Sequence, residues 1–262
     1  MGLLAQQRHE HILDQLRTTG RITVADVAQR FAVTEVTIRR DLALLERNGL
    51  LKKTYGGAVL AELPDVSMSV RFRQTRNLAA KRVVGRLAAS LIADGDILYL
   101  EAGSTCYEIV PYLSDKKELT IITNSLHLMS RLHEHIRHKI IITGGQYRHE
   151  RMDMIGPAAE AAISQLGGFK AFTSADDISI EGGISGADVA TVSFAKLVLR
   201  QASQVVFVGD HSKFDKPALY RIAGIEELDY IVTDTPPSEQ WHAAAMEKEI
   251  TLVYPDREAP SS

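Results

Sequence analysis

The sequence predicts an α/β protein with a small, mainly helical N-terminal domain and a larger domain built on a mostly parallel β-sheet. A length of 262 residues favours two domains or one large one, and a hydrophobic fraction of 45% is enough for a core. Residues 1–60 contain nine Lys and Arg against six Asp and Glu, whereas the rest contains 21 against 27. This asymmetry indicates a basic module joined to an acidic one. We expect domains at 1–60 and 78–255, a linker at 61–77 and a tail at 256–262.

The composition argues against several classes of protein. No apolar run reaches the roughly 18 residues of a membrane span, and the N-terminus lacks the basic patch and apolar run of a secretory signal. A single cysteine, Cys106, rules out an internal disulfide framework. These features predict a cytoplasmic protein with no membrane partner.

The first 60 residues predict helices at 8–16, 25–31 and 34–47. Thr23 can cap the second helix, whose first turn contains Asp26. Ala32 and Val33 form a tight turn, and Thr34 then caps the third helix. A helix, a short turn and a basic helix are the layout of a helix-turn-helix.

The third helix is expected to have two faces. Val36, Leu42 and Leu45 are predicted to form its buried stripe. The polar face is predicted to carry Thr34, Glu35, Thr37, Arg39 and Arg40. Arg can bond bidentately to guanine or clamp phosphate, and Thr can contact thymine methyl groups or phosphate. This face therefore predicts a major-groove reader, the alternative being an ordinary solvated helix.

Residues 50–60 predict a β-hairpin wing joined at Gly56 and Gly57. Lys52, Lys53 and Tyr55 would then face the DNA backbone or the minor groove. A plain hairpin that closes the small core is the alternative, and one hairpin can serve both purposes. The linker that follows is expected to become helical toward its end.

From residue 78 onward, apolar runs alternate with helical patterns. The runs lie at 97–100, 119–122, 139–142, 169–173, 204–208, 230–232 and 250–254, and the helices at 78–92, 106–113, 126–135, 157–165, 190–202 and 238–247. This alternation predicts a mostly parallel sheet covered on both faces.

Small or hydrogen-bonding residues follow five of these runs. They are 101–105, 123–125, 143–145, 174–177 and 209–214. One such segment is an ordinary turn or helix cap, but ligands of parallel sheets gather beyond the carboxyl ends of the strands. The five segments together predict a pocket for a polar small molecule that carries a phosphate at a helix N-terminus.

These residues resemble the DeoR family of bacterial transcriptional regulators. The helix-turn-helix signature is carried by Arg8, Ile12, Leu16, Thr34, Thr37, Ile38, Arg39, Arg40, Asp41 and Leu42, and continues in Thr54-Tyr-Gly-Gly-Ala58. The second domain is similar to the family's sensor domain at Glu101-Ala-Gly-Ser-Thr, Thr123-Asn-Ser, Gly144-Gly, Gly156-Pro, Ser174-Ala-Asp-Asp177, Glu181-Gly-Gly and Asp210-His-Ser-Lys-Phe.

The resemblance implies a repressor of sugar-catabolism genes that binds double-stranded operator DNA. A dimer or tetramer is expected, because operator half-sites mirror protein symmetry. It also implies a sensor fold related to ribose-5-phosphate isomerase and glucosamine-phosphate deaminase. Gly103, Ser104 and Thr105 would hold the phosphate of an effector. By the same resemblance Asn124, Asp176, Lys196, Asp210 and Lys213 would contact its sugar or its phosphate.

The sequence departs from the family pattern around this site. Glu101 replaces the usual Asp, Cys106 replaces a second Thr or a small polar residue, and Ser174 and Asp177 replace glycines. An added carboxylate disfavours a doubly charged ligand unless a cation pairs with it. The departures therefore predict an unusual effector.

Three further hypotheses concern a metal site, a reactive thiol and an enzyme. His127, His133, His135, His138 and His149 are close in sequence, but their spacing favours solvated histidines over a metal site. A helix N-terminus could lower the pKa of Cys106, although a pocket-lining thiol is the preferred interpretation. A sugar-phosphate isomerase or deaminase using Asp176, Asp177, Glu181 and Lys196 is the rival hypothesis. The preferred reading has no catalytic residue and no cofactor.

Overall fold

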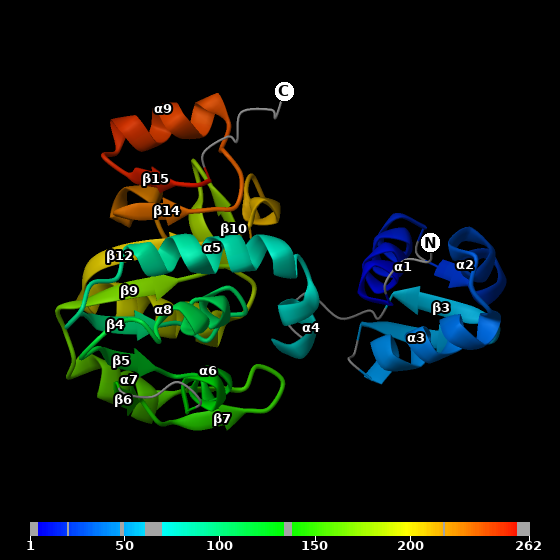
Figure 1. Cartoon of the computed structure of the whole chain (residues 1–262), viewed down its shortest axis with the longest axis horizontal. Helices are drawn as coiled ribbons and strands as arrows, with labels where there is room; N and C mark the ends of the chain where they lie inside the picture. The colour runs from blue at the N-terminus through cyan, green and yellow to red at the C-terminus, as the bar shows by residue number, and fades with distance from the viewer. Residues whose placement is uncertain are drawn as a thin grey trace. The chain divides into compact units, whose positions relative to one another are not determined.

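The computed structural model describes residues 5–19, 21–47, 50–60, 70–133, 138–216 and 218–255. The chain divides into two compact units, Met1–Arg76 and Asn77–Ser262 (Figure 1). The predicted tail, residues 61–69 of the predicted linker and His135 lie outside the described residues. The last part of the linker is helical, as predicted, and forms α4 (Val70–Thr75).

The first unit is a winged helix-turn-helix. Its elements are α1 (Ala5–Thr19), β1 (Arg21–Thr23), α2 (Val24–Phe31), α3 (Glu35–Arg47), β2 (Leu51–Thr54) and β3 (Gly57–Leu60). The wing strands β2 and β3 pair antiparallel, and β1 joins them in the order β1-β3-β2. The strand β1 was not predicted from the sequence. Gly57 permits it, because a Cβ atom there would lie 2.0 Å from the carbonyl oxygen of Ile22.

The buried stripe of α3 differs from the predicted one at its first residue. Ile38, Leu42 and Leu45 are buried in the core of the first unit, whereas Val36 is 56% exposed. Residues 38, 42 and 45 follow the i, i+4, i+7 spacing of one helix face, and residue 36 lies off that face. The assignment of Val36 to the core was therefore wrong, and Val36 lies with the polar residues.

The second unit contains a seven-stranded sheet in which every neighbouring pair is parallel (Figure 1). Its strands are β4 (Ile97–Leu100), β5 (Thr120–Thr123), β6 (Lys139–Ile142), β9 (Phe169–Thr173), β12 (Ala202–Val208), β14 (Tyr230–Val232) and β15 (Thr251–Val253), in the order β15-β14-β12-β9-β4-β5-β6. All seven predicted runs are strands of this sheet. After β4 the chain builds outward through β5 and β6, and then returns to place β9 on the other side of β4. This reversal makes the space beyond β4 and β9 the topological switch point of the sheet.

Two small antiparallel sheets extend the second unit and were not predicted. One contains β7 (Gln146–Arg148) and β8 (Asp153–Ile155). The other contains β10 (Asp177–Ser179), β11 (Gly183–Gly186) and β13 (Tyr220–Ala223). Their strands have three or four residues, too few for the apolar periodicity that identifies longer strands.

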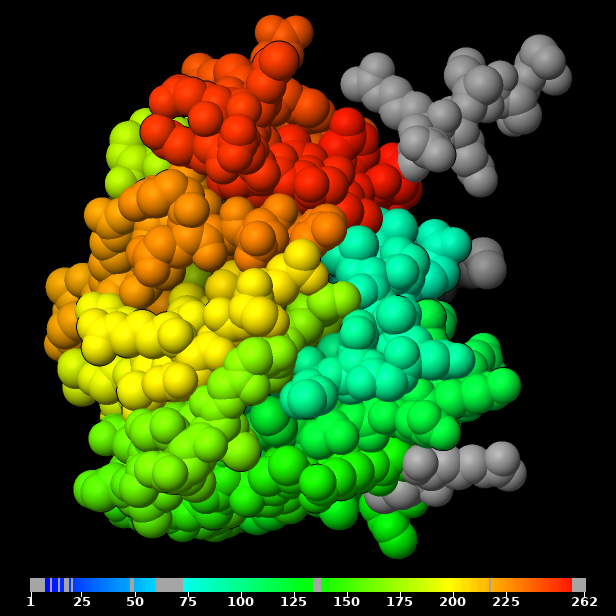
Figure 2. Space-filling model, turned by 90° about the vertical axis from the view of Figure 1, so that its left-hand side faces the viewer, coloured from blue at the N-terminus to red at the C-terminus, as the bar shows by residue number. Residues whose placement is uncertain are grey.

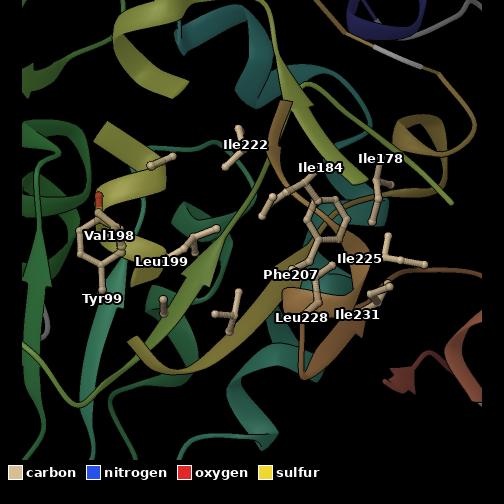
Figure 3. Packing of buried hydrophobic residues seen from close by; sticks show 14 of the residues in the cluster. Tyr99, Ile178, Ile184, Val198, Leu199, Phe207, Ile222, Ile225, Leu228 and Ile231 are labelled. Atoms are coloured by element: carbon tan, nitrogen blue, oxygen red, sulfur yellow. The ribbon is translucent and has the colours of Figure 1, made fainter. Parts of the chain in front are cut away.

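Helices cover both faces of the large sheet. They are α5 (Leu78–Ser90), α6 (Leu126–Leu132), α7 (Pro157–Ser164), α8 (Val189–Gln201) and α9 (Glu239–Glu247). Leu98 and Leu100 pack in a cluster with α5 and α6, whereas Tyr99 packs in a second cluster with α7, α8 and α9 (Figure 3). Alternate residues of β4 therefore face opposite layers. Figure 2 shows this unit as a space-filling model, with α5 in cyan and the C-terminal segments in red at one end.

The predicted helix at 106–113 is instead two consecutive 3-10 turns, Cys106–Glu108 and Val110–Tyr112. Pro111 explains the difference, because it has no N–H to donate to the carbonyl of Tyr107 four residues earlier. That carbonyl accepts a hydrogen bond from Arg131 Nη1 at 3.1 Å instead. The segment that follows strand β4 is thus too short to provide a full helix dipole.

Candidate functional site

The exposed face of α3 carries the side chains that the sequence assigned to DNA reading. Thr34, Glu35, Arg39 and Arg40 are exposed, and Thr37 is half-buried. Thr34 Oγ1 accepts a hydrogen bond from the Thr37 backbone N–H at 3.3 Å, so it caps α3 as predicted. Arg40 forms no hydrogen bond or ion pair with the described residues. Its guanidinium is therefore available to a partner outside this unit.

Arg39 is held differently from Arg40. Its Nη2 donates to Glu35 Oε2 at 2.7 Å, one turn earlier on the same helix, and both side chains are about half exposed. An exposed pair of this spacing adds only about 0.3–0.5 kcal/mol to helix stability. The pair therefore acts mainly on orientation, because it points the guanidinium of Arg39 along α3.

A buried ionic network lies beneath this face. Asp41 accepts hydrogen bonds from Arg8 Nε at 2.5 Å, and its other oxygen lies 2.8 Å from His9 Nε2. Arg8 and Asp41 are only 6% and 7% exposed. The network ties α1 to α3 and so sets the angle of the reading helix. Sequence reasoning noted Arg8 and Asp41 without a role, although an Asp inside a buried stripe is itself a sign of a buried partner.

The wing presents all three side chains that the sequence assigned to it. Lys52, Lys53 and Tyr55 are exposed, with Tyr55 at the tip of the hairpin. Glu46, near the end of α3, accepts from the Lys53 backbone N–H at 2.8 Å and pairs with Lys53 Nζ at 3.3 Å. The backbone hydrogen bond from Lys53 lowers the pKa of Glu46, and desolvation opposes it. The wing is thus fastened to the reading helix.

In the second unit, Glu101 connects the two strands at the topological switch point. It follows β4, and its Oε2 accepts hydrogen bonds from Thr173 Oγ1 at 2.7 Å and from the Ser174 backbone N–H at 2.6 Å at the end of β9. Burial raises the pKa of Glu101 to about 7, and the two hydrogen bonds only partly oppose that effect. The carboxyl group is therefore divided between its neutral and charged forms near neutral pH.

A small cavity lies beside Glu101. It is lined by Tyr99, Glu101, Ala102, Asn124, Asp153, Ile155, Thr173, Thr191, Phe194, Ala195 and Val198. Its free space is about that of one water molecule. Figure 3 shows Tyr99 and Val198 of this lining on the same side of the core cluster. The cavity combines one apolar wall from α8 with polar groups from the strand ends.

Asn124 lines this cavity and also holds it together. Its Oδ1 accepts from the Tyr99 hydroxyl at 3.0 Å, and its Nδ2 donates to the Met154 carbonyl at 3.0 Å. One side-chain N–H therefore remains for a ligand. Asn124 has a structural role that the sequence did not reveal, in addition to the predicted binding role.

The predicted phosphate loop lies at the same strand end. Gly103 N–H donates to the Glu101 carbonyl at 2.7 Å, and the Gly103 carbonyl accepts from Tyr107 N–H at 3.0 Å. Ser104 is partly exposed, whereas Thr105 is 1% exposed. A Cβ atom on Gly103 would lie 3.6 Å from Ser174 Cβ, so the loop lies beside the segment after β9.

Asp176, Asp210 and Lys213 form a second group at these strand ends. Lys213 Nζ donates to the Asp176 carbonyl at 3.0 Å, and Asp176 Oδ2 accepts from Ala187 N–H at 2.9 Å. Asp210 is 1% exposed and accepts from Ser212 Oγ at 2.5 Å and Asn77 Nδ2 at 2.9 Å. Burial alone would raise the pKa of Asp210, but these hydrogen bonds and the charge of Lys81 together lower it. The carboxylates are thus bound within the domain already.

Lys196 is not part of either group. It is exposed on α8, whereas the residues of α8 that line the cavity are Thr191, Phe194, Ala195 and Val198. The structure therefore separates Lys196 from the cavity to which the sequence had assigned it.

Arg148 is the main site residue that sequence reasoning missed. Its guanidinium donates to both oxygens of Asp153 at 2.8 and 2.6 Å, to Asp188 Oδ1 at 2.7 Å and to Thr191 Oγ1 at 2.8 Å. Asp188 in turn caps α8 through Thr191 N–H, and these bonds lower its pKa to about 2 against the effect of burial. Arg148 thus joins the β7–β8 hairpin to α8 and to two cavity residues. A lone Arg in a short strand gives no sequence signal for such a role.

Cys106 and the histidines are the possible reactive or metal-binding groups that the sequence suggested. Cys106 is fully buried among apolar side chains and is not one of the residues that line the cavity, and its Sγ lies 3.5 Å from the Phe172 carbonyl oxygen. Burial raises the pKa of its thiol, so the suggested lowered pKa and the pocket-lining role were both wrong. No group of three metal-binding side chains occurs among the described residues, and none of the described helices is long and apolar enough to cross a membrane.

Comparisons with known proteins agree with this architecture. Residues 8–63 match the family described as "DeoR-like helix-turn-helix domain", and residues 76–235 match "DeoR C terminal sensor domain". The chain is 32% identical to "Transcriptional repressor AccR" of Agrobacterium fabrum over 88% of this chain and 90% of that protein. It is also 32% identical to "HTH-type transcriptional repressor GlcR" of Bacillus subtilis, over 89% of this chain and 90% of that protein.

Among solved structures, the chain is similar to a D-ribose-5-phosphate isomerase in complex with phospho-erythronic acid. The TM-score is 0.39 at 16% identity, with 51% of this chain and 52% of that chain covered. The two family matches together span most of the chain and coincide with the winged helix-turn-helix and the parallel-sheet unit described above. The chain therefore belongs to the DeoR family and is a DNA-binding transcriptional regulator with a C-terminal sensor domain.

Proposed function

We propose that the protein represses carbohydrate-catabolism genes by binding operator DNA through α3 and the wing, and that a phosphorylated sugar in the sensor domain changes its DNA affinity. The observation that carries the DNA-binding half is the exposed face of α3, where Arg40 has no partner among the described residues. Thr34, Glu35, Thr37, Arg39 and Arg40 would enter the major groove, and Lys52, Lys53 and Tyr55 would contact the backbone. The functional regions would be 1–60, 61–77 and 78–255.

The effector would bind beyond β4 and β9, where the Gly103–Thr105 loop would hold its phosphate. The rest of the effector would contact residues at the neighbouring strand ends, namely Asn124, Asp176, Asp210 and Lys213. The exposed position of Lys196 argues against a direct contact with the effector. Since operator half-sites mirror protein symmetry, a dimer or tetramer in the cytoplasm is the expected form. Allosteric control requires only that the effector bind the DNA-bound and DNA-free states with different affinities.

The rival function, turnover of a sugar phosphate, is less well supported by the geometry. Asp176 is bonded through Oδ2 to the Ala187 backbone N–H, and Lys196 lies on an exposed face of α8. The acid and base that the rival requires are therefore not brought together around the cavity. We accordingly propose a binding domain without catalysis.

The test is operator binding by full-length variants. A labelled duplex selected from random DNA by the wild-type protein serves as the operator. Arg40→Ala and Arg39→Ala should each weaken binding by about 10- to 100-fold, since a good base contact contributes about 1–3 kcal/mol. Arg200→Ala, which removes an exposed Arg from α8, is the matched control and should bind normally. Normal binding by the double variant Arg39→Ala, Arg40→Ala would rule out the proposed reading face.

A further inference from the structure

The side chain of Glu101 is fixed by one of its two carboxylate oxygens. Oε2 accepts both hydrogen bonds from the end of β9, from Thr173 Oγ1 and Ser174 N–H. Oε1 has no hydrogen-bond partner among the described residues, and the residue lines the cavity at the switch point. Since Oε1 is not among the fully enclosed atoms without a partner, it stays accessible to a donor from outside the chain.

The other carboxylate and the amide that line the cavity already accept hydrogen bonds. Both oxygens of Asp153 accept from Arg148, and Asn124 Oδ1 accepts from the Tyr99 hydroxyl. The remaining walls include the apolar side chains of Ile155, Phe194 and Val198. Among the carboxylate and amide oxygens of the cavity lining, Glu101 Oε1 is therefore the one without a described donor.

The charges around the cavity also determine what it rejects. Glu101 and Asp153 line it, and Asp176 is close enough to oppose the ionisation of Glu101. The guanidinium of Arg148 is shared between Asp153 and Asp188, so it is largely neutralised. A phosphate or carboxylate in this cavity would meet a carboxylate without a cation to pair with it. The space, about that of one water molecule, would fit a hydroxyl or an amino group.

We propose that Glu101 selects the effector by its end remote from the phosphate, because the cavity accepts a hydroxyl or amino group that donates to Oε1 and excludes an anion. This inference rests on the proposed function, in which the strand ends hold the effector. The phosphate would then remain outside the cavity, at the Gly103–Thr105 loop. The extra methylene of Glu101 relative to the Asp of the family pattern brings the carboxylate further from its own strand.

Glu101→Gln is the decisive variant because it preserves the shape of the side chain. The Gln carbonyl oxygen can still accept from Thr173 and Ser174, which leaves the NH2 group facing the cavity as a donor. The variant thus reverses the hydrogen-bonding preference of the cavity. Glu239→Gln, at an exposed position at the start of α9, is the matched control.

The experiment measures the affinity of full-length wild type and both variants for glucosamine 6-phosphate, glucose 6-phosphate and 6-phosphogluconate by calorimetry and thermal shift. Away from the phosphate, the first probe carries an amine, the second has only hydroxyls and the third has a carboxylate. The wild type and Glu239→Gln should bind the first two at least about tenfold more tightly than 6-phosphogluconate. In Glu101→Gln the affinity for glucosamine 6-phosphate should fall about tenfold, and the affinity for 6-phosphogluconate should rise.

Two results would overturn the proposal. The first is an unchanged ranking of the three probes in Glu101→Gln, which would leave the effector site in place but remove Glu101 from selection. The second is a wild-type protein that binds none of the probes. Operator binding is measured on the same preparations, so that loss of the DNA-binding function is distinguished from failure of this inference.

Discussion

The reading face of α3 and the strand-end site of the sensor domain use polar side chains in opposite ways. On α3, Glu35, Arg39 and Arg40 are exposed, and their only described bond is the pair between Glu35 and Arg39. At the strand ends, Asp153 and Asp210 are 3% and 1% exposed and accept several hydrogen bonds each. The polar side chains of α3 are free to contact a partner molecule, whereas those at the strand ends are largely hydrogen-bonded within the domain.

This difference separates binding from stability. A side chain on the α3 face can be removed with little effect on folding, because it contributes little to the packed core. A side chain at the strand ends holds neighbouring elements in place, so its removal affects both the free energy of unfolding and the site. Variants on the α3 face should therefore mainly change DNA binding. Variants at the strand ends should mainly change the free energy of unfolding.

The largest expected effect is at Arg148. Arg148→Met leaves Asp153 buried without its cation, and removing one partner of such a pair costs about 3–5 kcal/mol. Urea unfolding followed by the fluorescence of Trp241, the single tryptophan and a buried residue of the sensor domain, measures this loss. Arg200→Met on the exposed face of α8 is the control. A loss below about 1 kcal/mol would mean that the network is incidental to stability.

Glu101 should make stability depend on pH. Burial raises its pKa from 4.5 to about 7, with Asp176 and Asp153 adding to the rise and Thr173 and Ser174 opposing it. The folded state therefore binds this proton more tightly than the unfolded state does. The resulting stabilisation is complete below about pH 4.5 and is lost as the pH rises through about 7, with a full size of about 3 kcal/mol.

Glu101→Gln removes this ionisation, so its unfolding free energy should rise relative to wild type between pH 5 and pH 8, as measured by urea titrations at each pH. Glu239→Gln should follow the wild-type curve throughout. Parallel curves for wild type and Glu101→Gln would show that Glu101 titrates as an ordinary exposed carboxyl group.

The contrast between the two regions also explains what sequence alone could predict. The polar face of α3 follows from helical periodicity, and the seven strands follow from apolar runs, because both patterns are local. Even there, Val36 was assigned to the wrong side, since Ile38 fits the buried spacing better. Predicting the 3-10 turns at residues 106–112 requires giving the missing N–H of Pro111 more weight than the apolar pattern.

The strand-end site depends on contacts between residues far apart in sequence. Glu101 meets Thr173 across 72 positions, and Arg148 meets Asp188 across 40. Periodicity carries no information about such pairings. The motifs did place the Gly103–Thr105 loop, Asn124 and Asp210 at strand ends, but they could not show that Asn124 is bonded to Tyr99 or that Lys196 is on the exposed face of α8.

A smaller effect is expected at the wing. Lys52 is exposed and would contact a phosphate, so Lys52→Ala should weaken binding several-fold for operator and unrelated DNA alike. The slope of log K against log salt should fall by about 1, because one counterion fewer is released. Fluorescence anisotropy at several salt concentrations measures both quantities. An unchanged slope would place Lys52 away from the DNA, and the sensor-domain unfolding transition should be unaffected.

The smallest expected effect tests whether the exposed pair on α3 contributes to specificity. Glu35→Gln removes a negative charge from the DNA-facing side and weakens the bond that holds Arg39. Binding to unrelated DNA should rise a few-fold, because repulsion between Glu35 and phosphate disappears. Operator binding should gain less, because Arg39 then loses the orientation that favours a bidentate contact with guanine. The ratio of the two affinities, measured by competition, should therefore fall about two- to threefold, an amount consistent with an exposed pair of about 0.5 kcal/mol. An unchanged ratio would show that Glu35 affects only the overall charge of the face and has no part in orienting Arg39.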